Sequence, residues 1–256
     1  MKKINRYELF ILEGTLEYVL LEVKNKYPSV NIAKEYKDRI IFESEKKDIK
    51  VFRNLYSPIG IENEQGIKLD LSKREWRKEY VPAGINPSLA YLMCMIANLK
   101  DNDIVYDPFC GSGVLPISAF KYFNIKKAIC SDISGSAVEK CKNNFNTANI
   151  DKSRYMIFRS DINDVYLNKR NIDLIISNLP FGIRVGNHTE NISSYIALEN
   201  LASKVLRKKG RLILLTQEKK LIREIFKKGV WSVKSVLEVN EGGLRPEVFR
   251  IERTVV

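Results

Sequence analysis

Histidine and paired cysteines are nearly absent from this chain. Its 256 residues include one histidine, His188, and four cysteines without a C-x-x-C pair. This composition disfavours a zinc site and the Ser-His-Asp and Cys-His classes of catalysis, so no metal is predicted. We expect the cysteines to be reduced and buried; they are Cys94, Cys110, Cys130 and Cys141.

Long apolar runs and a secretion signal are also lacking. No stretch reaches the roughly 18 apolar residues that a membrane span requires. The N-terminal sequence MKKINRYELF carries lysines without an apolar core or a small-residue cleavage site. We therefore expect a cytoplasmic protein with no membrane partner.

Two nucleotide-binding fingerprints are missing. The motif G-x-G-x-x-G fails because Val114-Leu115-Pro116 follows Gly113, and no Walker motif is present. A nicotinamide dehydrogenase and a P-loop NTPase are thus disfavoured.

Positive charge is in excess. The 43 Lys and Arg residues exceed the 31 Asp and Glu residues by 12. Such an excess favours polyanionic partners such as nucleic acid, although a lysine-rich surface from a low-GC genome is the alternative. Hydrophobic residues make up 45% of the chain, enough for a sizeable core and for one large domain with a small appendage.

Residues 1–78 differ in pattern from the remainder and predict a small α+β domain. Short apolar alternations predict strands, and apolar residues at helical spacing predict one helix. The strands are expected at 7–12, 39–43 and 49–53, and the helix at 16–27. Residues 57–78, with Pro58, two glycines and mixed charges, predict a loop or linker.

Residues 79–256 alternate between strands and helices, which predicts a mostly parallel sheet with right-handed crossovers. Five strands are expected at 103–107, 128–132, 155–159, 172–178 and 211–216. Helices are expected at 113–123, 134–146, 191–206 (closed by Gly210) and 218–228. Residues 231–239 and 247–254 predict a closing β pair.

Polar residues follow the first strand, in the run Asp107-Pro108-Phe109-Cys110-Gly111-Ser112-Gly113. Ligands of such sheets bind outside the carboxyl ends of the strands. Gly111 and Gly113 allow a positive φ and a close approach of main chain to a ligand, and the helix beyond offers free N–H groups. A plain strand-to-helix turn is the alternative.

Acids follow the second and third strands. Asp132 lies 25 residues after Asp107 (132 − 107), where an acid can accept both hydroxyls of a ribose. Asp161 can reach an adenine amine and Ile162 can cover a ring face. Both acids have an alternative interpretation as helix caps or helix N-terminal charges.

The fourth strand ends in Asn178-Leu179-Pro180-Phe181-Gly182. The side-chain oxygen of Asn178 can accept a hydrogen bond from an amine, the proline stiffens the turn, and Phe181 can stack on a base. An asparagine-capped turn with a buried phenylalanine is the alternative.

These motifs resemble a known family. D-P-F-C-G-S-G followed by N-L-P-F-G resembles the Rossmann-like methyltransferases that use S-adenosyl-L-methionine to methylate exocyclic amines. The resemblance is closer to the THUMP-associated RNA guanine-N2 methyltransferases, and it covers about residues 76–256. Three further stretches agree: 80–87 as the segment closing over the cofactor, 178–186 as the catalytic loop, and 242–244 as the hairpin of the closing strands.

The resemblance implies a class I fold with a seven-stranded, mostly parallel sheet and an antiparallel closing strand. It implies S-adenosyl-L-methionine bound by Gly84, Asn86, Asp107, Pro108, Phe109, Gly111, Gly113, Asp132, Ile133, Asp161, Ile162 and Asn178. It assigns catalysis to Asn178, Leu179, Pro180 and Phe181, and RNA contact to Phe181 and Arg184.

The implied reaction is methylation of a guanosine N2 in RNA, above all tRNA. Adenine-N6 enzymes of this class usually read N-P-P-Y, and Leu179 and Phe181 depart from that pattern. Adenine-N6, guanine-N2 in ribosomal RNA and a non-catalytic RNA-binding subunit remain alternatives. Residues 1–78 resemble a shortened ferredoxin-like piece without a full THUMP module, so a protein partner could supply the missing RNA-docking part; residues 79–256 form the predicted methyltransferase domain.

Overall fold

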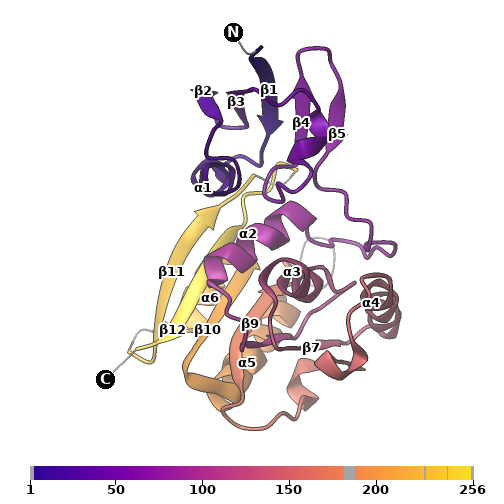
Figure 1. Cartoon of the computed structure of the whole chain (residues 1–256). Coiled ribbons are helices and arrows are strands. Elements are labelled where there is room, and N and C mark those ends of the chain that lie inside the picture. The colour runs from indigo at the N-terminus through magenta and orange to yellow at the C-terminus, as the bar shows by residue number, and fades with distance from the viewer. Residues whose placement is uncertain (1–2, 182–187, 228, 241, 255–256) are drawn as a thin grey trace.

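Two β-sheets organise the chain, one above the other in Figure 1. The computed structural model describes residues 3–181, 188–227, 229–240 and 242–254. The N-terminal sheet has five strands and the larger sheet has seven.

The N-terminal sheet has the strand order β2-β3-β1-β4-β5. Its elements are β1 (Asn5–Phe10), α1 (Leu16–Lys26), β2 (Asn31–Glu35), β3 (Arg39–Ser44), η1 (Ile49–Phe52), β4 (Gly60–Asn63) and β5 (Lys68–Asp70). Up to β4 this is the β-α-β-β-α-β succession with its second helix reduced to a single 3-10 turn. Val19 and Val23 of α1 pack with Leu9 and Phe42 of the sheet in one apolar core.

Two predictions for this region are wrong. Residues 49–53, expected as a strand, form η1, because the Asp48 side chain accepts from Lys50 N at 2.9 Å and so caps a helical turn. Residues 57–78, expected as a linker, contain the β4–β5 hairpin. Asn63 Oδ1 accepts from Ile67 N at 2.9 Å in its turn, and strands this short leave little alternation to detect.

The larger sheet has the order β11-β12-β10-β9-β6-β7-β8. Its strands are β6 (Ile104–Asp107), β7 (Lys127–Asp132), β8 (Tyr155–Arg159), β9 (Ile172–Asn178), β10 (Leu206–Thr216), β11 (Trp231–Glu238) and β12 (Glu247–Arg253). The pairs from β10 to β8 are parallel, whereas β12 is antiparallel to both of its neighbours. The predicted class I architecture is therefore confirmed.

Helices cover both faces of this sheet because successive strand residues point to opposite sides. Leu212 and Leu214 belong to one core, and Ile213 and Leu215 belong to the other. The helices α2 (Pro87–Ala97), α3 (Val114–Phe123) and α4 (Gly135–Thr147) pack on the side of Ile213, and α5 (His188–Val205) and α6 (Lys219–Ile225) pack on the opposite side. Among the described residues, no helix is both long and apolar enough to cross a bilayer.

Gly210 does not close a helix as predicted. The helix α5 ends at Val205 and β10 begins at Leu206, so Gly210 lies inside the strand. The pairing of β10 with β9 shifts register between Leu206 and Arg211, which places Gly210 in an irregular stretch of the strand. Pairing with β9 thus outweighs the local helix-stop signal.

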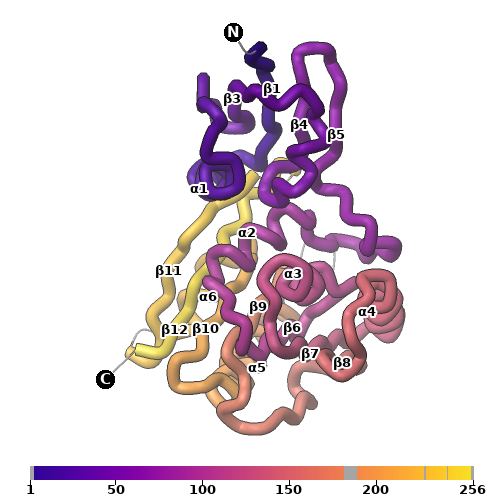
Figure 2. The backbone as a smooth tube through the Cα atoms, in the orientation of Figure 1, coloured from indigo at the N-terminus to yellow at the C-terminus, as the bar shows by residue number. Residues whose placement is uncertain are grey.

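The two sheets meet at the β11–β12 hairpin, which runs up to α1 in Figure 2. Asn240 donates its main-chain N–H to Glu13 O at 3.2 Å and its side-chain amide to Glu13 Oε2 at 3.1 Å. Tyr18 Oη donates to Val236 O at 3.3 Å. The boundary at residues 78 and 79 stays a prediction.

Gly14 lies against the main chain of β11 at Glu238, and its substitution tests this contact. Gly14 has φ +99°, and a Cβ there would overlap Glu238 O. Gly229 has a similar φ of +101° with nothing within 4 Å of such a Cβ. We expect Gly229→Ala to lower the free energy of unfolding by about 1–2 kcal/mol from backbone strain alone.

Gly14→Ala carries that strain and the overlap, so we expect a further loss of roughly 1–3 kcal/mol. Urea unfolding followed by circular dichroism measures both variants. Equal losses in the two variants would show that the main chains of the two units do not press on each other at Gly14.

Candidate active site

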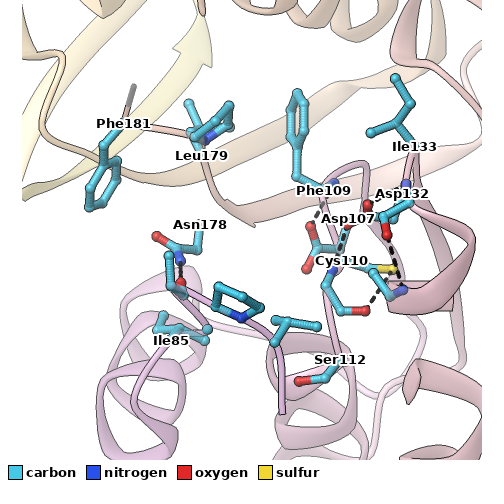
Figure 3. A pocket seen from close by; sticks show the side chains of 18 of the residues that line it. Ile85, Asp107, Phe109, Cys110, Ser112, Asp132, Ile133, Asn178, Leu179 and Phe181 are labelled. Carbon is cyan, nitrogen blue, oxygen red and sulfur yellow. Dashed lines mark hydrogen bonds between the residues drawn. The ribbon is translucent and has the colours of Figure 1, made fainter. Parts of the chain in front are cut away.

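A cavity of about 800 Å³ lies where β6, β7 and β9 end. This volume is within the range of natural small-molecule sites. The strand order reverses between β6 and β9, and ligands of open α/β sheets bind at that crevice. Figure 3 shows side chains from these strand ends gathered around the cavity.

Eleven of the predicted site residues line this cavity. They are Gly84, Asp107, Phe109, Gly111, Asp132, Ile133, Asp161, Asn178, Leu179, Pro180 and Phe181. They come from five separate segments of the chain, so the topology brings together what the sequence holds apart.

Four predicted cofactor residues do not line the cavity. Asn86 caps α2, its side chain accepting from Ser88 N at 2.8 Å. Gly113 has φ +82°, and a Cβ there would lie 2.7 Å from Cys141 Sγ, so it permits helix packing.

The other two, Pro108 and Ile162, are buried, Ile162 within the core on the α5 side. Arg184, predicted to contact RNA, lies outside the described residues, as do residues 182–186 of the predicted catalytic loop.

The Asp132 carboxylate joins the turn between β6 and α3 to the end of β7. Asp132 Oδ2 accepts from Gly111 N and Asp132 Oδ1 accepts from Ser134 N, both at 2.9 Å. Gly111 has φ +51°, a conformation that glycine adopts without penalty. This carboxylate therefore orders the main chain at two edges of the cavity.

Asp107 is the buried acid of the site, with 2% of its surface exposed. Ser177 Oγ donates to Asp107 Oδ1 at 2.6 Å, and Phe109 N donates to the same oxygen at 3.2 Å. Burial raises the pKa of Asp107 to about 8, and these two hydrogen bonds only partly oppose the shift.

Asn178 presents its amide oxygen as a buried acceptor. Its Nδ2 donates to Ala83 O at 3.2 Å, drawn as a dashed line in Figure 3. A carbonyl cannot donate, so the nitrogen must face Ala83 and the oxygen must face away. Oδ1 is buried and has no hydrogen-bond partner among the described residues.

The carbonyl that orients Asn178 belongs to a strained turn. Gly84 N donates to Val81 O at 3.2 Å, closing a turn over residues 81–84. Ala83 occupies its third position with φ +55°, where a type II turn favours glycine. Such a conformation costs an alanine roughly 1–2 kcal/mol.

The main chain after Asn178 is also held in place. Leu179 N donates to Leu215 O at 3.0 Å, and Tyr195 Oη donates to Pro180 O at 2.9 Å. Tyr195 is fully buried and shares a second hydrogen bond of 2.7 Å with Thr216 Oγ1. These contacts fix the direction of the 178–180 peptides.

Several of these residues were not predicted from the sequence. Ser177 and Ala83 act through contacts with segments distant in the chain, and Tyr195 looks like any apolar position of α5. Lys140 lines the cavity from α4, and its Nζ donates to Tyr80 O at 2.8 Å. The one usable signal was Ala83-Gly84 directly after Val81-Pro82, a typical turn sequence.

The fold and cavity define a class I, Rossmann-like domain with a ligand site at the topological switch point. The family model described as "RMKL-like, methyltransferase domain" matches residues 74–247. The chain belongs to this methyltransferase family.

Curated relatives extend beyond this chain. Mouse "tRNA (guanine(6)-N(2))-methyltransferase THUMP3" is 28% identical over 225 residues, which cover 81% of this chain and 43% of the mouse protein. The chain thus spans less than half of that relative's length.

Solved structures confirm the fold. TrmN from Thermus thermophilus superimposes with a TM-score of 0.83 at 15% identity, covering 98% of this chain and 100% of that one. SMU.472, solved as a complex with SAH, gives a TM-score of 0.79 at 14% identity, with 100% of both chains covered.

The raised pKa of Asp107 predicts a pH-dependent stability. Between about pH 4 and pH 8 the folded protein holds a proton on Asp107 that the unfolded chain has lost. Its contribution is therefore complete below pH 4 and is lost progressively as pH rises from about 4 through the folded-state pKa near 8, by up to about 1.4 kcal/mol per pH unit.

Asp107→Asn is the matched control because the amide oxygen keeps both hydrogen bonds and cannot titrate. Urea unfolding of both proteins at a series of pH values gives the difference that belongs to Asp107. Parallel profiles for the two proteins would contradict the raised pKa.

Proposed function

We propose that this protein transfers a methyl group from S-adenosyl-L-methionine to the N2 amine of a guanosine in RNA, and that the RNA is a tRNA. The observation that carries this proposal is the buried, unpartnered Asn178 Oδ1, an acceptor prepared for an N–H donor. The methyltransferase family and the name of the mouse relative support the reaction class and the base.

The cavity suits the proposed cofactor. Asp132 and Asp161 both line the cavity, which supports the roles proposed for them as acceptors of the ribose hydroxyls and of the adenine amine, respectively. Ser112 also lines the cavity, and its buried Oγ has no hydrogen-bond partner among the described residues. When bound, the cofactor supplies an electrophilic methyl group; the SAH complex of SMU.472 supports this choice.

Substrate positioning is the task of the 178–181 segment. The guanine must leave its stack, which costs a few kcal/mol, and stacking on the half-buried Phe181 returns roughly 1–3 kcal/mol. Asn178 Oδ1 and the Leu179 carbonyl accept the two N2 protons. With both protons held by these acceptors, the direction in which the nitrogen lone pair points is fixed.

No strong general base is required of the protein. The amine becomes acidic once it carries the additional methyl group, and its proton can then leave to water. Catalysis consequently rests on orientation and on the fixed dipoles around the amine. The contacts of Ala83 with Asn178 and of Tyr195 with Pro180 provide that fixed geometry.

RNA docking concerns residues 1–78 and the parts of the relatives that have no counterpart in this chain. We propose that 1–78 form a separate small domain beside the methyltransferase domain 79–256. A partner that supplies an additional RNA-docking module would raise RNA affinity without changing the methylated base.

Asn178→Ala is the decisive variant. It removes the acceptor of the amine, so we expect the rate of transfer to fall by roughly 10²–10³-fold. The affinity for S-adenosylhomocysteine, measured by calorimetry, should stay near wild type. Asn200→Ala, at an exposed position of α5, is the matched control and should leave both quantities unchanged.

Labelled cofactor followed by nucleoside mass spectrometry identifies the product. N2-methylguanosine is the expected nucleoside. Labelled N6-methyladenosine would instead identify adenine as the substrate base and contradict the choice of guanine. A wild-type protein that binds neither cofactor nor its product would indicate an RNA-binding scaffold instead.

A further inference from the structure

The chain segment that leads into the cavity wall carries an exposed aromatic ring with a cation on one face. Tyr80 is 58% exposed and directly precedes Val81, which lines the cavity. We propose that Tyr80, Arg77 and Lys140 form a docking site for an RNA nucleotide adjacent to the methylated one, its base stacked on Tyr80 and its phosphate near the cations. This inference rests on the proposed function and extends its substrate contacts beyond the target base.

Arg77 and the Tyr80 ring form one stacked unit. The guanidinium carbon of Arg77 lies 4.7 Å from the ring centroid. Arg77 also lies against the turn of the cavity wall, since a Cβ on Gly84 would lie 3.2 Å from Nη2. The stack therefore continues the wall formed by residues 81–84.

The charge of Arg77 is available to a ligand. No carboxylate of the described residues forms an ion pair with Arg77, and its buried Nε has no hydrogen-bond partner among them. A guanidinium that stacks on an aromatic ring and keeps unused donors is suited to nucleic acid, which offers both ring faces and phosphate oxygens.

Hydrogen bonds from α4 hold the main chain at and before Tyr80 in place. Lys78 N and Glu79 N both donate to Asn144 Oδ1 at 2.9 Å, and Asn144 Nδ2 donates to Glu79 O at 3.0 Å. Lys140 holds Tyr80 O from the same helix, α4. Stacking on a fixed ring loses little conformational entropy, so more of the stacking energy appears as affinity.

The requirement for such a contact follows from the reaction. Turning out the target base exposes a face of its neighbour, and an aromatic ring at the cavity rim can cover that face. Tyr80 is placed for this role because its own chain continues into the wall of the cavity. Tyr166 is more exposed, at 94%, but neither residue next to it in the chain lines the cavity, and no cation lies over its ring among the described residues.

Tyr80→Ala tests the ring. With a labelled, unmodified tRNA transcript, fluorescence anisotropy should show a Kd raised roughly 5- to 100-fold, the range of one lost base–aromatic stack. Tyr80→Phe keeps the ring and should bind as wild type does. Tyr166→Ala is the control for loss of an exposed tyrosine and should leave the Kd unchanged.

Lys140→Ala tests the phosphate contact through salt. The slope of log K against log salt concentration should fall in magnitude by about 0.7–0.9, the effect of one lost phosphate contact. Lys142 lies on the same helix but pairs with Glu139 at 2.7 Å, so Lys142→Ala should not change the slope. Circular dichroism of each variant confirms that it is folded.

Three outcomes would overturn the inference. Tyr80→Ala could bind the transcript as tightly as wild type, or Tyr166→Ala could lose as much affinity as Tyr80→Ala. Tyr80→Ala could also lose S-adenosylhomocysteine affinity in calorimetry, which would assign the ring to the cofactor. A Tyr80-dependent RNA affinity without any methyl transfer by the wild type would instead contradict the proposed function alone.

Discussion

The pairing of β6 with β9 is the constraint on which the site depends. Val105 aligns with Leu174 and Tyr106 with Ile175, so the two strands end side by side. Continuing this register sets Asp107 beside Ile176, and the side chain of Ser177, one residue further along β9, donates to Asp107 Oδ1 at 2.6 Å. This hydrogen bond satisfies an oxygen of the buried Asp107 carboxyl. Asn178 follows Ser177 directly and so lies at the crevice where the strand order reverses.

The closing hairpin links this crevice to the N-terminal sheet. Its connection contributes Gly242 and Leu244 to the cavity wall, while Asn240 of the same connection bonds to Glu13. A close main-chain approach at Gly14 makes the arrangement possible. The N-terminal unit and the wall of the cavity therefore both contact one short segment of the chain.

The sequence predicted the strand ends and missed what orients them. Asp107, Asp132 and Asn178 were recognisable because each follows an apolar run, and the carboxyl ends of parallel strands converge whatever the details. The orienting contacts are tertiary: the Ala83 carbonyl reaches a side chain 95 residues away. Gly113 was assigned to the cofactor because a glycine does not reveal whether a ligand or a helix fills the space beside it; here Cys141 does.

The positive φ of Ala83 is explained by its role in orienting the Asn178 side-chain amide. A free asparagine amide can exchange its oxygen and nitrogen by half a turn about χ2. With the Ala83 carbonyl in place, the reversed orientation would set two oxygens against each other and lose the 3.2 Å hydrogen bond. That bond contributes roughly 0.5–1.5 kcal/mol, no more than the strain of the positive φ. Stability alone does not account for the turn. Fixing one orientation of the amide does, because the proposed amine substrate can donate to the Asn178 oxygen but not to its NH2 group.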